Sequence, residues 1–431
     1  DVQAPLHDFL GHHMAIIGQS RSGKSNLGKG VVREFNDISS NQLAESVMGQ
    51  LIFDSDGEWS HDSSQTNSLS GLLGNDCHIF SPNPQGNERS IKTNFYEELP
   101  AALDFLKNII KNENQSLSDY KKNFLSVEIP TIDEIQNMTN GTRLRASRKV
   151  LMMYAILHKA GFDVGTTNLA FMDPQFSAEL RILAHPNMMP PVRSLDQLVI
   201  EFEKIAKFAR ANKWTDHDAL TTTTNNPLFD ADDIALLEFL MPQAQRSGVK
   251  LLMPYRKFHD ANASHAIDII LNLLDEGKVV IIDMSTSDEE LKNSMIERVC
   301  SKIYYSQNKK LQNSTLKKEK FLHVVIEEAQ SILFDNDSII EKLTKQGSKH
   351  NIGMTFITQS ISSIDKKYLD QIQNIFCTHF SSSEEASFLV KRNSQFTEHK
   401  SQLVNVRARG YMRGTTLSTR FIVPFQAPEF V

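Results

Sequence analysis

The stretch Gly18-Gln-Ser-Arg-Ser-Gly-Lys-Ser25 decides how this sequence folds. It follows the apolar run Met14–Ile17, which is typical of a buried strand, and it precedes a segment of helical periodicity over Asn26–Phe35. Its two glycines let the backbone approach a ligand closely, and the N–H groups of such a loop and of the following helix point toward one place. Lys24 adds a positive charge and Ser25 a hydroxyl. The stretch therefore predicts a phosphate-binding loop, or P-loop, between a strand and a helix.

Two other predicted strands end in acidic side chains. The apolar run Leu322–Ile326 is followed directly by Glu327 and Glu328. In a P-loop fold, one carboxylate at such a strand end holds Mg²⁺, and a second can orient or deprotonate the attacking water. The other strand, Leu51–Phe53, ends in Asp54-Ser-Asp-Gly-Glu58-Trp, with three acids around a glycine. A charged, solvated turn is the alternative interpretation of this second segment.

A further strand, Met354–Ile357, ends in Thr358-Gln359-Ser. Ligands of open α/β sheets bind in the crevice at the carboxyl ends of the strands, so we expect Gln359 to face the same site. The other predicted elements are a strand over Val279–Ile282 and helices over 264–276, 288–306, 337–346 and 364–373. Residues 410–424 alternate in polarity and contain a Gly-Thr-Thr turn, which predicts a C-terminal β-hairpin.

The chain divides into three parts by pattern. Residues 1–95 and 264–431 alternate strands with helices, which predicts one α/β core with a mostly parallel sheet. Residues 96–263 show helical periodicity, with Asn- and Thr-rich stretches between the helices. We therefore expect a helical insertion there rather than a second catalytic domain. Within it, Ser194-Leu-Asp-Gln197 predicts a capping box at the start of a helix that runs to Ala211.

The composition is that of an ordinary globular protein. Its 431 residues are 40% hydrophobic and 23% charged with a net charge of −6, so any nucleic-acid-binding surface must be local. Cys77, Cys300 and Cys377 lie far apart without a CxxC pattern, so neither a zinc site nor a disulfide framework is expected. We expect a cytoplasmic protein without a membrane span or signal peptide. Because the sequence begins at Asp1 rather than Met, we also expect residues ahead of it.

Five motifs in this order resemble the HerA-type ATPases of the HerA–FtsK group of P-loop NTPases. That family has GxxxxGKS, an Asp-x-x-Gly-Glu-aromatic strand end, a Gly-Lys-hydrophobic-Asp-Leu-Ser strand, Glu-Glu-Ala-His/Gln and a strand ending in Ser/Thr-Gln. The matching residues here are 18–25, 54–59, 277–285, 327–330 and 358–359. The resemblance covers about 1–95 and 265–425. It implies a RecA-like P-loop core with a helical-bundle insertion, and an enzyme that hydrolyses ATP with Mg²⁺.

The resemblance also implies roles for single residues. Lys24 and Ser25 would bind the phosphates and Mg²⁺, and Glu327 would lie on the metal side. Glu328 would activate the water, and Gln359 would sense the γ-phosphate. The residues expected to contact the nucleotide are Gly18, Gln19, Ser20, Arg21, Ser22, Gly23, Lys24, Ser25, Asn26, Asp54 and Glu58.

The sequence departs from the family pattern in two places. Family members carry arginines just before the Gln strand, including a finger that reaches the site of a neighbouring subunit, whereas this stretch is Lys345-Gln-Gly-Ser-Lys349-His350. Lysine does not reproduce the guanidinium fork, so either Lys345 substitutes weakly or another arginine serves. The second departure is the missing N-terminal β-barrel, which family members use to dock a partner nuclease.

Three basic clusters stand outside these motifs. One is Arg143, Arg145, Arg148 and Lys149, another is Arg256 and Lys257, and the third is Arg407, Arg409, Arg413 and Arg420 near the predicted hairpin. Solvated faces and ion pairs are the plainer interpretation of each. The third cluster has a second interpretation, as the source of a replacement finger or of a DNA contact.

The resemblance implies a homohexamer that moves along DNA, most simply duplex DNA, with ATP bound between subunits. In the family such a helicase-like motor works with a partner nuclease or effector, for instance an NAD-consuming enzyme, in DNA end processing or anti-phage defence. A ring repeats each phosphate contact, so an acidic net charge does not exclude DNA. Two alternatives stay open. One is a ring scaffold that uses ATP for assembly or regulation of an effector, and the other is a DNA-packaging or conjugative coupling motor.

Overall fold

The computed structural model describes residues 4–40, 46–62, 67–113, 117–186, 191–222, 225–244, 246–263, 265–331, 338–419 and 421–430. The chain forms two compact units. One comprises Asp1–Ile91 together with Ala266–Val431, and the other comprises Lys92–His265. The second unit is close to the helical insertion that was expected over residues 96–263. That this unit is a domain inserted into an ATPase core stays a prediction.

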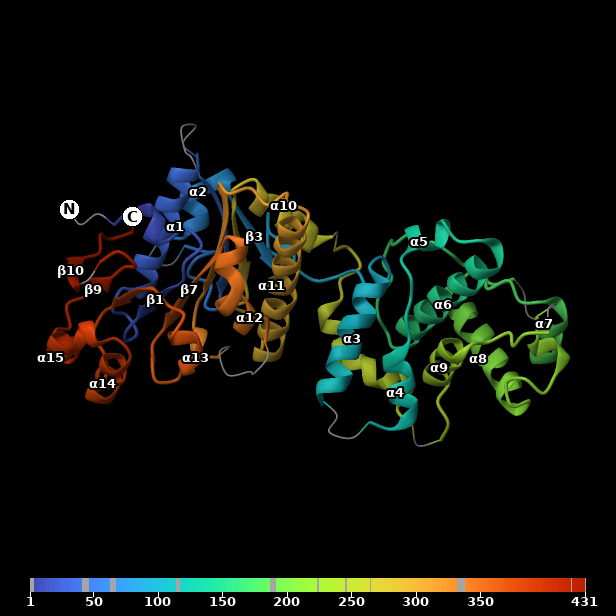
Figure 1. Cartoon of the computed structure of the whole chain (residues 1–431). Coiled ribbons are helices and arrows are strands. Elements are labelled where there is room, and N and C mark those ends of the chain that lie inside the picture. The colour runs from blue at the N-terminus through green and yellow to red at the C-terminus, as the bar shows by residue number, and fades with distance from the viewer. Residues whose placement is uncertain are drawn as a thin grey trace. The chain divides into compact units, whose positions relative to one another are not determined.

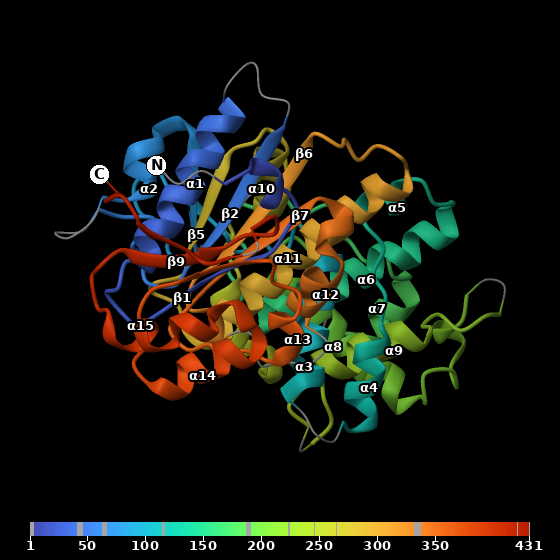
Figure 2. The ribbon, with the colours of Figure 1, turned by 60° about the vertical axis from the view of Figure 1, so that its left-hand side comes forward.

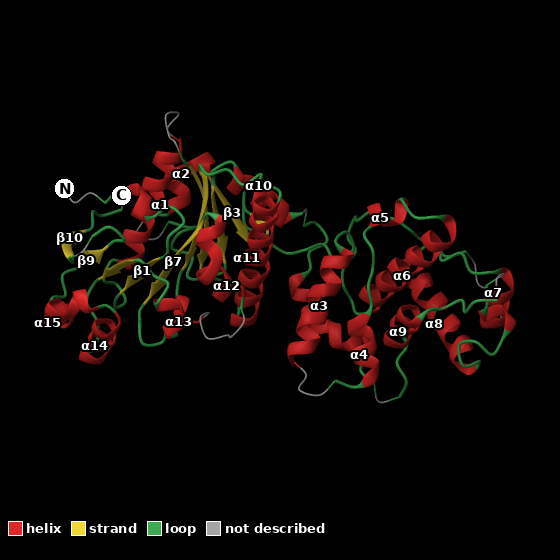
Figure 3. Ribbon diagram, viewed as in Figure 1, coloured by secondary structure: helices red, strands yellow, loops and turns green. Residues whose placement is uncertain are grey.

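The first unit is built on one large sheet (Figure 3). In the described residues ten strands pair in the order β10-β9-β8-β1-β7-β6-β2-β5-β3-β4. All neighbours from β8 to β4 are parallel, whereas β9 pairs with β8, and β10 with β9, in antiparallel fashion. The expected mostly parallel α/β core is therefore present. The strands are β1 (Met14–Ile17), β2 (Val47–Asp54), β3 (Cys77–Ser81), β4 (Arg89–Ser90), β5 (Val279–Asp283), β6 (Lys320–Ile326), β7 (Ile352–Thr358), β8 (Asn374–Cys377), β9 (Tyr411–Thr415) and β10 (Val423–Gln426).

Helices cover both faces of this sheet, because its central strands are apolar on both sides. Met14 and Ile16 of β1 pack in one cluster with Val32 of α1, whereas Ala15 and Ile17 pack in another with residues of α14 and α15. Figure 2 shows α14 and α15 lying together near β1 and β9. The helices of this unit are α1 (Lys24–Ser40), α2 (Leu69–Leu73), α10 (Ala266–Asp275), α11 (Glu289–Gln312), α12 (Ile339–Gln346), α13 (Lys366–Leu369), α14 (Ser383–Arg392) and α15 (Lys400–Asn405).

The second unit is helical (Figure 1). Its longest helix, α6, is buried along most of its second half and contacts both α8 and α9. Phe124 of α4 stacks on Phe239 of α9 with ring centroids 3.8 Å apart, which ties two shorter helices together. The helices are α3 (Leu99–Glu113), α4 (Asp119–Ser126), α5 (Ile132–Gln136), α6 (Asn140–Lys159), α7 (Ala178–Ala184), α8 (Leu195–Ala211) and α9 (Ala231–Leu240). No helix in the described ranges is both long and apolar enough to cross a membrane.

Several expected elements differ in extent or in local bonding. The helix expected over 364–373 is only the four-residue α13, and β8 begins at its predicted end. The hairpin forms, but Gly414 and Thr415 lie inside β9, so the turn comes later than the Gly-Thr-Thr sequence suggests. At the start of α8 the Ser194 hydroxyl accepts the N–H of Gln197 as expected. The Gln197 side chain, however, accepts the N–H of Arg193 rather than closing a capping box.

Two glycines of α1 make opposite predictions for stability. A Cβ at Gly30 would meet no atom within 4 Å. Gly30→Ala should therefore stabilise the folded protein by about 0.5–1 kcal/mol, because alanine loses less backbone conformational entropy than glycine when the helix forms. A Cβ at Gly28 would lie 2.9 Å from Ile357 and 3.0 Å from the Trp59 ring, so Gly28→Ala should destabilise by about 1–3 kcal/mol. Urea unfolding of the two variants measures both effects. Equal shifts in the two variants would contradict the close packing of α1 on β7.

Candidate functional site

The functional side chains meet because the central parallel strands end at one edge of the sheet. The register pairs Ile17 with Thr358 between β1 and β7, and Asp54 with Asp283 between β2 and β5. Glu327 follows the last residue of β6, and its N–H donates to the Phe53 carbonyl of β2 at 3.3 Å. The P-loop, both acidic strand ends and the Gln359 strand end therefore lie at the same edge of the sheet.

The P-loop has the backbone conformation that its glycines allow. Gly18 and Gly23 have φ angles of 152° and 102°, and a Cβ at Gly18 would lie 1.6 Å from the Thr378 hydroxyl oxygen. A Cβ at Gly23 would lie 3.0 Å from the backbone of Gly410. Side chains at either position would displace the loop, so the glycines are needed for close packing as well as for approach of a ligand.

Lys24 is held in place by the loop itself. It is 7% exposed, and its Nζ donates to the Gln19 carbonyl at 3.0 Å. Burial lowers the pKa of Lys24, while the carboxylates of Glu328, Glu327 and Glu58 oppose that shift. The Lys24 ammonium can exchange its hydrogen bond with the Gln19 carbonyl for contacts with phosphate oxygens. The exchange is favourable because a hydrogen bond between opposite charges is stronger than one to a neutral carbonyl.

Gln19 is fixed by His379 at two atoms. Its N–H donates to the His379 carbonyl at 3.0 Å, and its side-chain oxygen lies 2.9 Å from His379 Nε2. Ser22 makes equivalent contacts on the far side of the loop. Its hydroxyl lies 2.7 Å from that of Thr378, and its carbonyl accepts the N–H of Gly410 at 2.9 Å. The segment that follows β8 and the segment that precedes β9 thus hold the P-loop through hydrogen bonds.

Ser25 and Glu327 form a candidate metal site beside the P-loop. The Ser25 hydroxyl donates to Glu327 Oε1 at 3.0 Å, and Glu327 Oε2 is buried without a hydrogen-bond partner. Burial raises the pKa of Glu327 to about 8, with the nearby Asp54 carboxyl as a second cause. Hydroxyl and carboxylate oxygens are the ligands that Mg²⁺ prefers, and an orphaned carboxylate oxygen gains most from a cation. The donor set therefore fits Mg²⁺ at this position.

Glu328, Gln359 and Ser20 form a bridge above the P-loop. The Gln359 amide nitrogen donates to Glu328 Oε1 at 2.6 Å, and the Ser20 hydroxyl donates to the Gln359 amide oxygen at 2.5 Å. The other oxygen of Glu328 accepts from the Gln330 amide, whose oxygen accepts the Thr358 hydroxyl at 2.7 Å. Glu328 has φ 50°, a left-handed conformation that costs a non-glycine residue energy. The strained backbone of Glu328 thus accompanies a carboxylate that hydrogen bonds hold in one orientation.

Asp54 and Glu58 have different surroundings. Asp54 is fully buried and accepts from the N–H groups of Gly57, Trp59 and Ser60 and from the Ser60 hydroxyl, at 2.8–3.1 Å. Its side chain thus organises the loop that carries Glu58. Burial raises the pKa of Asp54, although the Ser60 hydrogen bonds oppose the shift. Glu58 is exposed, and its charge acts on both Lys24 and Lys29.

The remaining nucleotide candidates lie where the loop enters the helix. Arg21 has φ 59° and is exposed, so its side chain is not packed in the interior of this chain. Asn26 uses its side chain to bind the C-terminal tail. Its amide nitrogen donates to the Pro428 carbonyl at 2.6 Å, and its amide oxygen accepts the Phe430 N–H at 2.7 Å.

Lys345 lies apart from the site in its own chain. It is near the end of α12, which precedes the amino end of β7, whereas the P-loop borders the carboxyl end of that strand. The length of β7 separates the two by about 20 Å. Lys345 is half-exposed and pairs with Glu341 at 2.5 Å. Any contact of Lys345 with a nucleotide must therefore involve another subunit.

Three residues of the basic clusters, Arg148, Lys149 and Arg413, are engaged in local packing or pairing. Arg148 is 8% exposed, donates to the Pro174 and Gln175 carbonyls and stacks over Phe176, and Lys149 pairs with Asp230 and Asp232. In the C-terminal cluster Arg413 is a fully buried residue of β9, whereas Arg407 and Arg409 are exposed on the loop that contacts the P-loop. Arg420 lies outside the described residues.

Sequence reasoning missed three residues that shape the site. Gln330 was part of a recognised motif without an assigned role, and Thr378 and His379 follow a strand that was not predicted. The run Ile375–Cys377 within this strand is apolar and short, and its position after β7 is the signal that could have identified the strand. Its pairing with β1 brings the next two residues under the P-loop.

The packing of Gly18 predicts how the loop fails. Gly18→Ala should weaken ADP binding at least about tenfold while leaving the fold intact, because its Cβ cannot coexist with the Thr378 side chain. Gly18→Ala combined with Thr378→Ala, which removes the hydroxyl group at the clash, should recover part of the loss. Isothermal titration with ADP, and circular dichroism as the control for folding, measure this. Unchanged ADP binding would rule out this loop as the phosphate site.

Comparison with known proteins supports the resemblance drawn from the motifs. No protein-family model matches the chain. The DNA double-strand break repair helicase HerA of Saccharolobus solfataricus is 23% identical over 160 residues, which is 35% of this chain and 31% of that protein. The chain thus spans about a third of the length of this curated relative.

Solved structures that the chain matches include VirB4 of Thermoanaerobacter pseudethanolicus, with 12% identity, a TM-score of 0.42 and coverage of 95% of this chain and 88% of that one. The plasmid coupling protein TrwB in complex with ADP and Mg²⁺ has 14% identity, a TM-score of 0.45 and coverage of 100% and 89%. The genome packaging NTPase B204 from Sulfolobus turreted icosahedral virus 2 has 13% identity, a TM-score of 0.25 and coverage of 34% and 66%. In its motifs and in its sequence match, the chain is similar to the HerA-type P-loop ATPases.

Proposed function

We propose that the protein is a Mg²⁺-dependent ATPase whose hydrolytic site is the crevice between the P-loop and the strand ends. The observation that carries this proposal is the convergence of Ser25, Glu327 and Glu328 from two segments 300 residues apart. Ser25 bonds to Glu327, and Glu328 is turned toward Ser20 of the loop through Gln359. A phosphate loop alone binds nucleotides, whereas a loop with two oriented carboxylates also supports hydrolysis.

Each residue has one task in this scheme. The P-loop N–H groups and Lys24 bind and orient the phosphates. Ser25 and Glu327 hold Mg²⁺, which neutralises charge on the phosphate oxygens when it is bound. Glu328 accepts the proton of the attacking water, and Gln359 holds the Glu328 carboxylate through its amide until the γ-phosphate competes for that amide. The buried position of Glu327 limits access of bulk water to the metal side.

We further propose that the chain works as a ring-shaped motor, a homohexamer that moves along duplex DNA together with a nuclease or other effector such as an NAD-consuming enzyme. The similarity to the repair helicase HerA supports this proposal, and DNA end processing or anti-phage defence is the expected setting. Lys345 supports a site shared between subunits, because it cannot reach the P-loop of its own chain. Exposed Arg407 and Arg409 are candidates for contacts with DNA phosphates or a neighbouring nucleotide.

A second candidate is an ATP-regulated scaffold that assembles an effector and moves little on DNA. It is favoured by the lysine at the position where an arginine finger is expected, because a finger contributes about 10³–10⁵ in rate in P-loop enzymes and lysine lacks its fork. Lys345 is also engaged by Glu341, which lowers its availability to a neighbour.

Substitution of the catalytic base tests the ATPase proposal. Glu328→Gln keeps the shape of the side chain but cannot accept a proton, so ATP turnover should fall at least about 100-fold while ATP still binds. Phosphate release with and without duplex DNA measures both this effect and the motor. Turnover by the wild type that rises with DNA supports a motor, and turnover that ignores DNA supports the scaffold. Wild-type protein that does not hydrolyse ATP, or a Glu328→Gln variant as fast as the wild type, contradicts the ATPase.

Mixed rings test the position of Lys345. Lys345→Ala should lower turnover in an assembled ring, and so should Lys24→Ala, but for defects at opposite sides of one shared site. A mixture of the two variants should therefore recover activity, because some neighbours combine an intact P-loop with an intact Lys345. Lys349→Ala, an exposed lysine in the same segment, is the matched control and should have no effect. Full activity of Lys345→Ala would direct the search for a finger to Arg407 and Arg409.

A further inference from the structure

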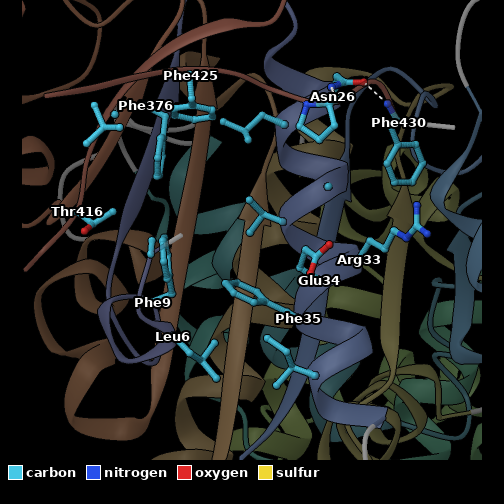
Figure 4. A pocket seen from close by; sticks show the side chains of 18 of the residues that line it. Leu6, Phe9, Asn26, Arg33, Glu34, Phe35, Phe376, Thr416, Phe425 and Phe430 are labelled. Carbon is cyan, nitrogen blue, oxygen red and sulfur yellow. Dashed lines mark hydrogen bonds between the residues drawn. The ribbon is translucent and has the colours of Figure 1, made fainter. Parts of the chain in front are cut away.

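A cavity of about 520 Å³ runs along the outer side of α1, within the first unit. Its walls are α1 on one side and β8, β9 and β10 on the other, with the tail after β10 at one end and the segment before β1 at the other. Figure 4 shows Asn26 and Phe430 joined near one end and Leu6 near the opposite end. The volume is in the range of ligand-binding pockets in proteins.

The walls of this cavity are largely apolar. Five phenylalanine rings are among them, those of Phe9, Phe35, Phe376, Phe425 and Phe430, and Figure 4 shows Phe9, Phe376 and Phe425 on one side of α1 and Phe430 on its other side. Polar groups lie mainly at its edges, with the Asn26 amide at the end near the P-loop. A flat aromatic ligand that needs few hydrogen bonds suits such walls, because stacking and apolar contact depend on area rather than on donors.

The tail connects this cavity to the P-loop. Asn26 is the residue directly after Ser25, and its side chain holds the tail at the Pro428 carbonyl and at the Phe430 N–H. Lys29, one turn further along α1, has its Nζ 5.7 Å from the centre of the Phe430 ring. The tail therefore crosses the first turn of α1, where a nucleotide whose phosphates lie in the loop leaves it.

We propose that the end of this cavity next to Asn26, together with the tail Ala427–Phe430, binds the nucleoside half of the nucleotide. This inference rests on the proposed function, since it takes the phosphates to be held by residues 18–25. From there the sugar and base must pass Asn26, and the apolar walls beyond it offer a surface for the face of a base. The segment Ala427–Phe430 is then part of the substrate site.

The cavity is longer than a nucleoside, so only part of it takes part. Ile38 also lines it but lies twelve residues beyond Asn26 on α1, which places it about 18 Å further along the helix axis. A base tethered to phosphates in the P-loop does not reach that depth. Ile38 thus offers a control within the same cavity.

Two ligands separate the nucleoside contacts from the phosphate contacts. Inorganic tripolyphosphate has the phosphates of ATP without sugar or base, whereas ADP has both. Asn26→Ala keeps the backbone N–H that faces the phosphates but releases the tail at both hydrogen bonds. Affinity for ADP should fall about tenfold, and affinity for tripolyphosphate should change less than about twofold. Isothermal titration of both ligands in the presence of Mg²⁺ measures this.

A shortened chain that ends at Gln426 should repeat the result, because β10 is complete at that residue. Ile38→Ala should leave both affinities unchanged. The inference is overturned if Asn26→Ala and the shortened chain weaken both ligands equally or neither ligand, or if Ile38→Ala weakens ADP as much as Asn26→Ala does. Failure of the wild type to bind tripolyphosphate or ADP overturns the nucleotide site itself, which is a separate outcome from failure of the tail alone.

Discussion

The pairing of β1 with β7 is the contact on which the site depends. It continues one residue past the strand, where the Gly18 N–H donates to the Thr358 carbonyl at 3.2 Å. That bond fixes the start of the P-loop beside the residue that precedes Gln359. Because β6 and β2 follow β7 in the sheet with their carboxyl ends at the same edge, Glu327 and Asp54 are carried to the loop by backbone pairing alone. Side chains then refine a geometry that the sheet has already set.

Charge is the second constraint on this crevice. Burial raises the pKa of both Glu327 and Asp54, and a neighbouring carboxyl group adds to each shift, Asp54 for Glu327 and Asp283 for Asp54. Lys24 and Lys29 lie within reach of the same carboxylates. A buried set of like charges is costly unless cations and hydrogen bonds compensate for it. A bound divalent cation compensates for the charge of the carboxylates, and a polyphosphate pairs with the lysines. The site therefore suits a cation and an anion bound together.

The C-terminal segments are more closely involved in the site than their position in the chain suggests. His379 and Thr378 support the P-loop from β8, Gly410 donates to Ser22, and Asn26 holds the tail. These contacts link residues nearly 400 positions apart. The P-loop, β9 and the segment after β10 are therefore joined by one set of hydrogen bonds.

The sequence by itself determined the fold class, the phosphate loop and the strand ends that face it. These follow from local patterns, because an apolar strand, a glycine-rich turn and a helix can be recognised within about thirty residues. It could not determine β8, the roles of Gln330 and His379, or the burial of Arg413, since each depends on which strands become neighbours. A four-residue segment such as Asn374–Cys377 is too short for its periodicity to distinguish strand from helix, and only its pairing with β1 made it a strand. Tertiary structure also decided that Asp54 organises its own loop and that Lys345 lies at the far edge of the sheet, because hydrogen bonding and strand length, rather than residue type, set those positions.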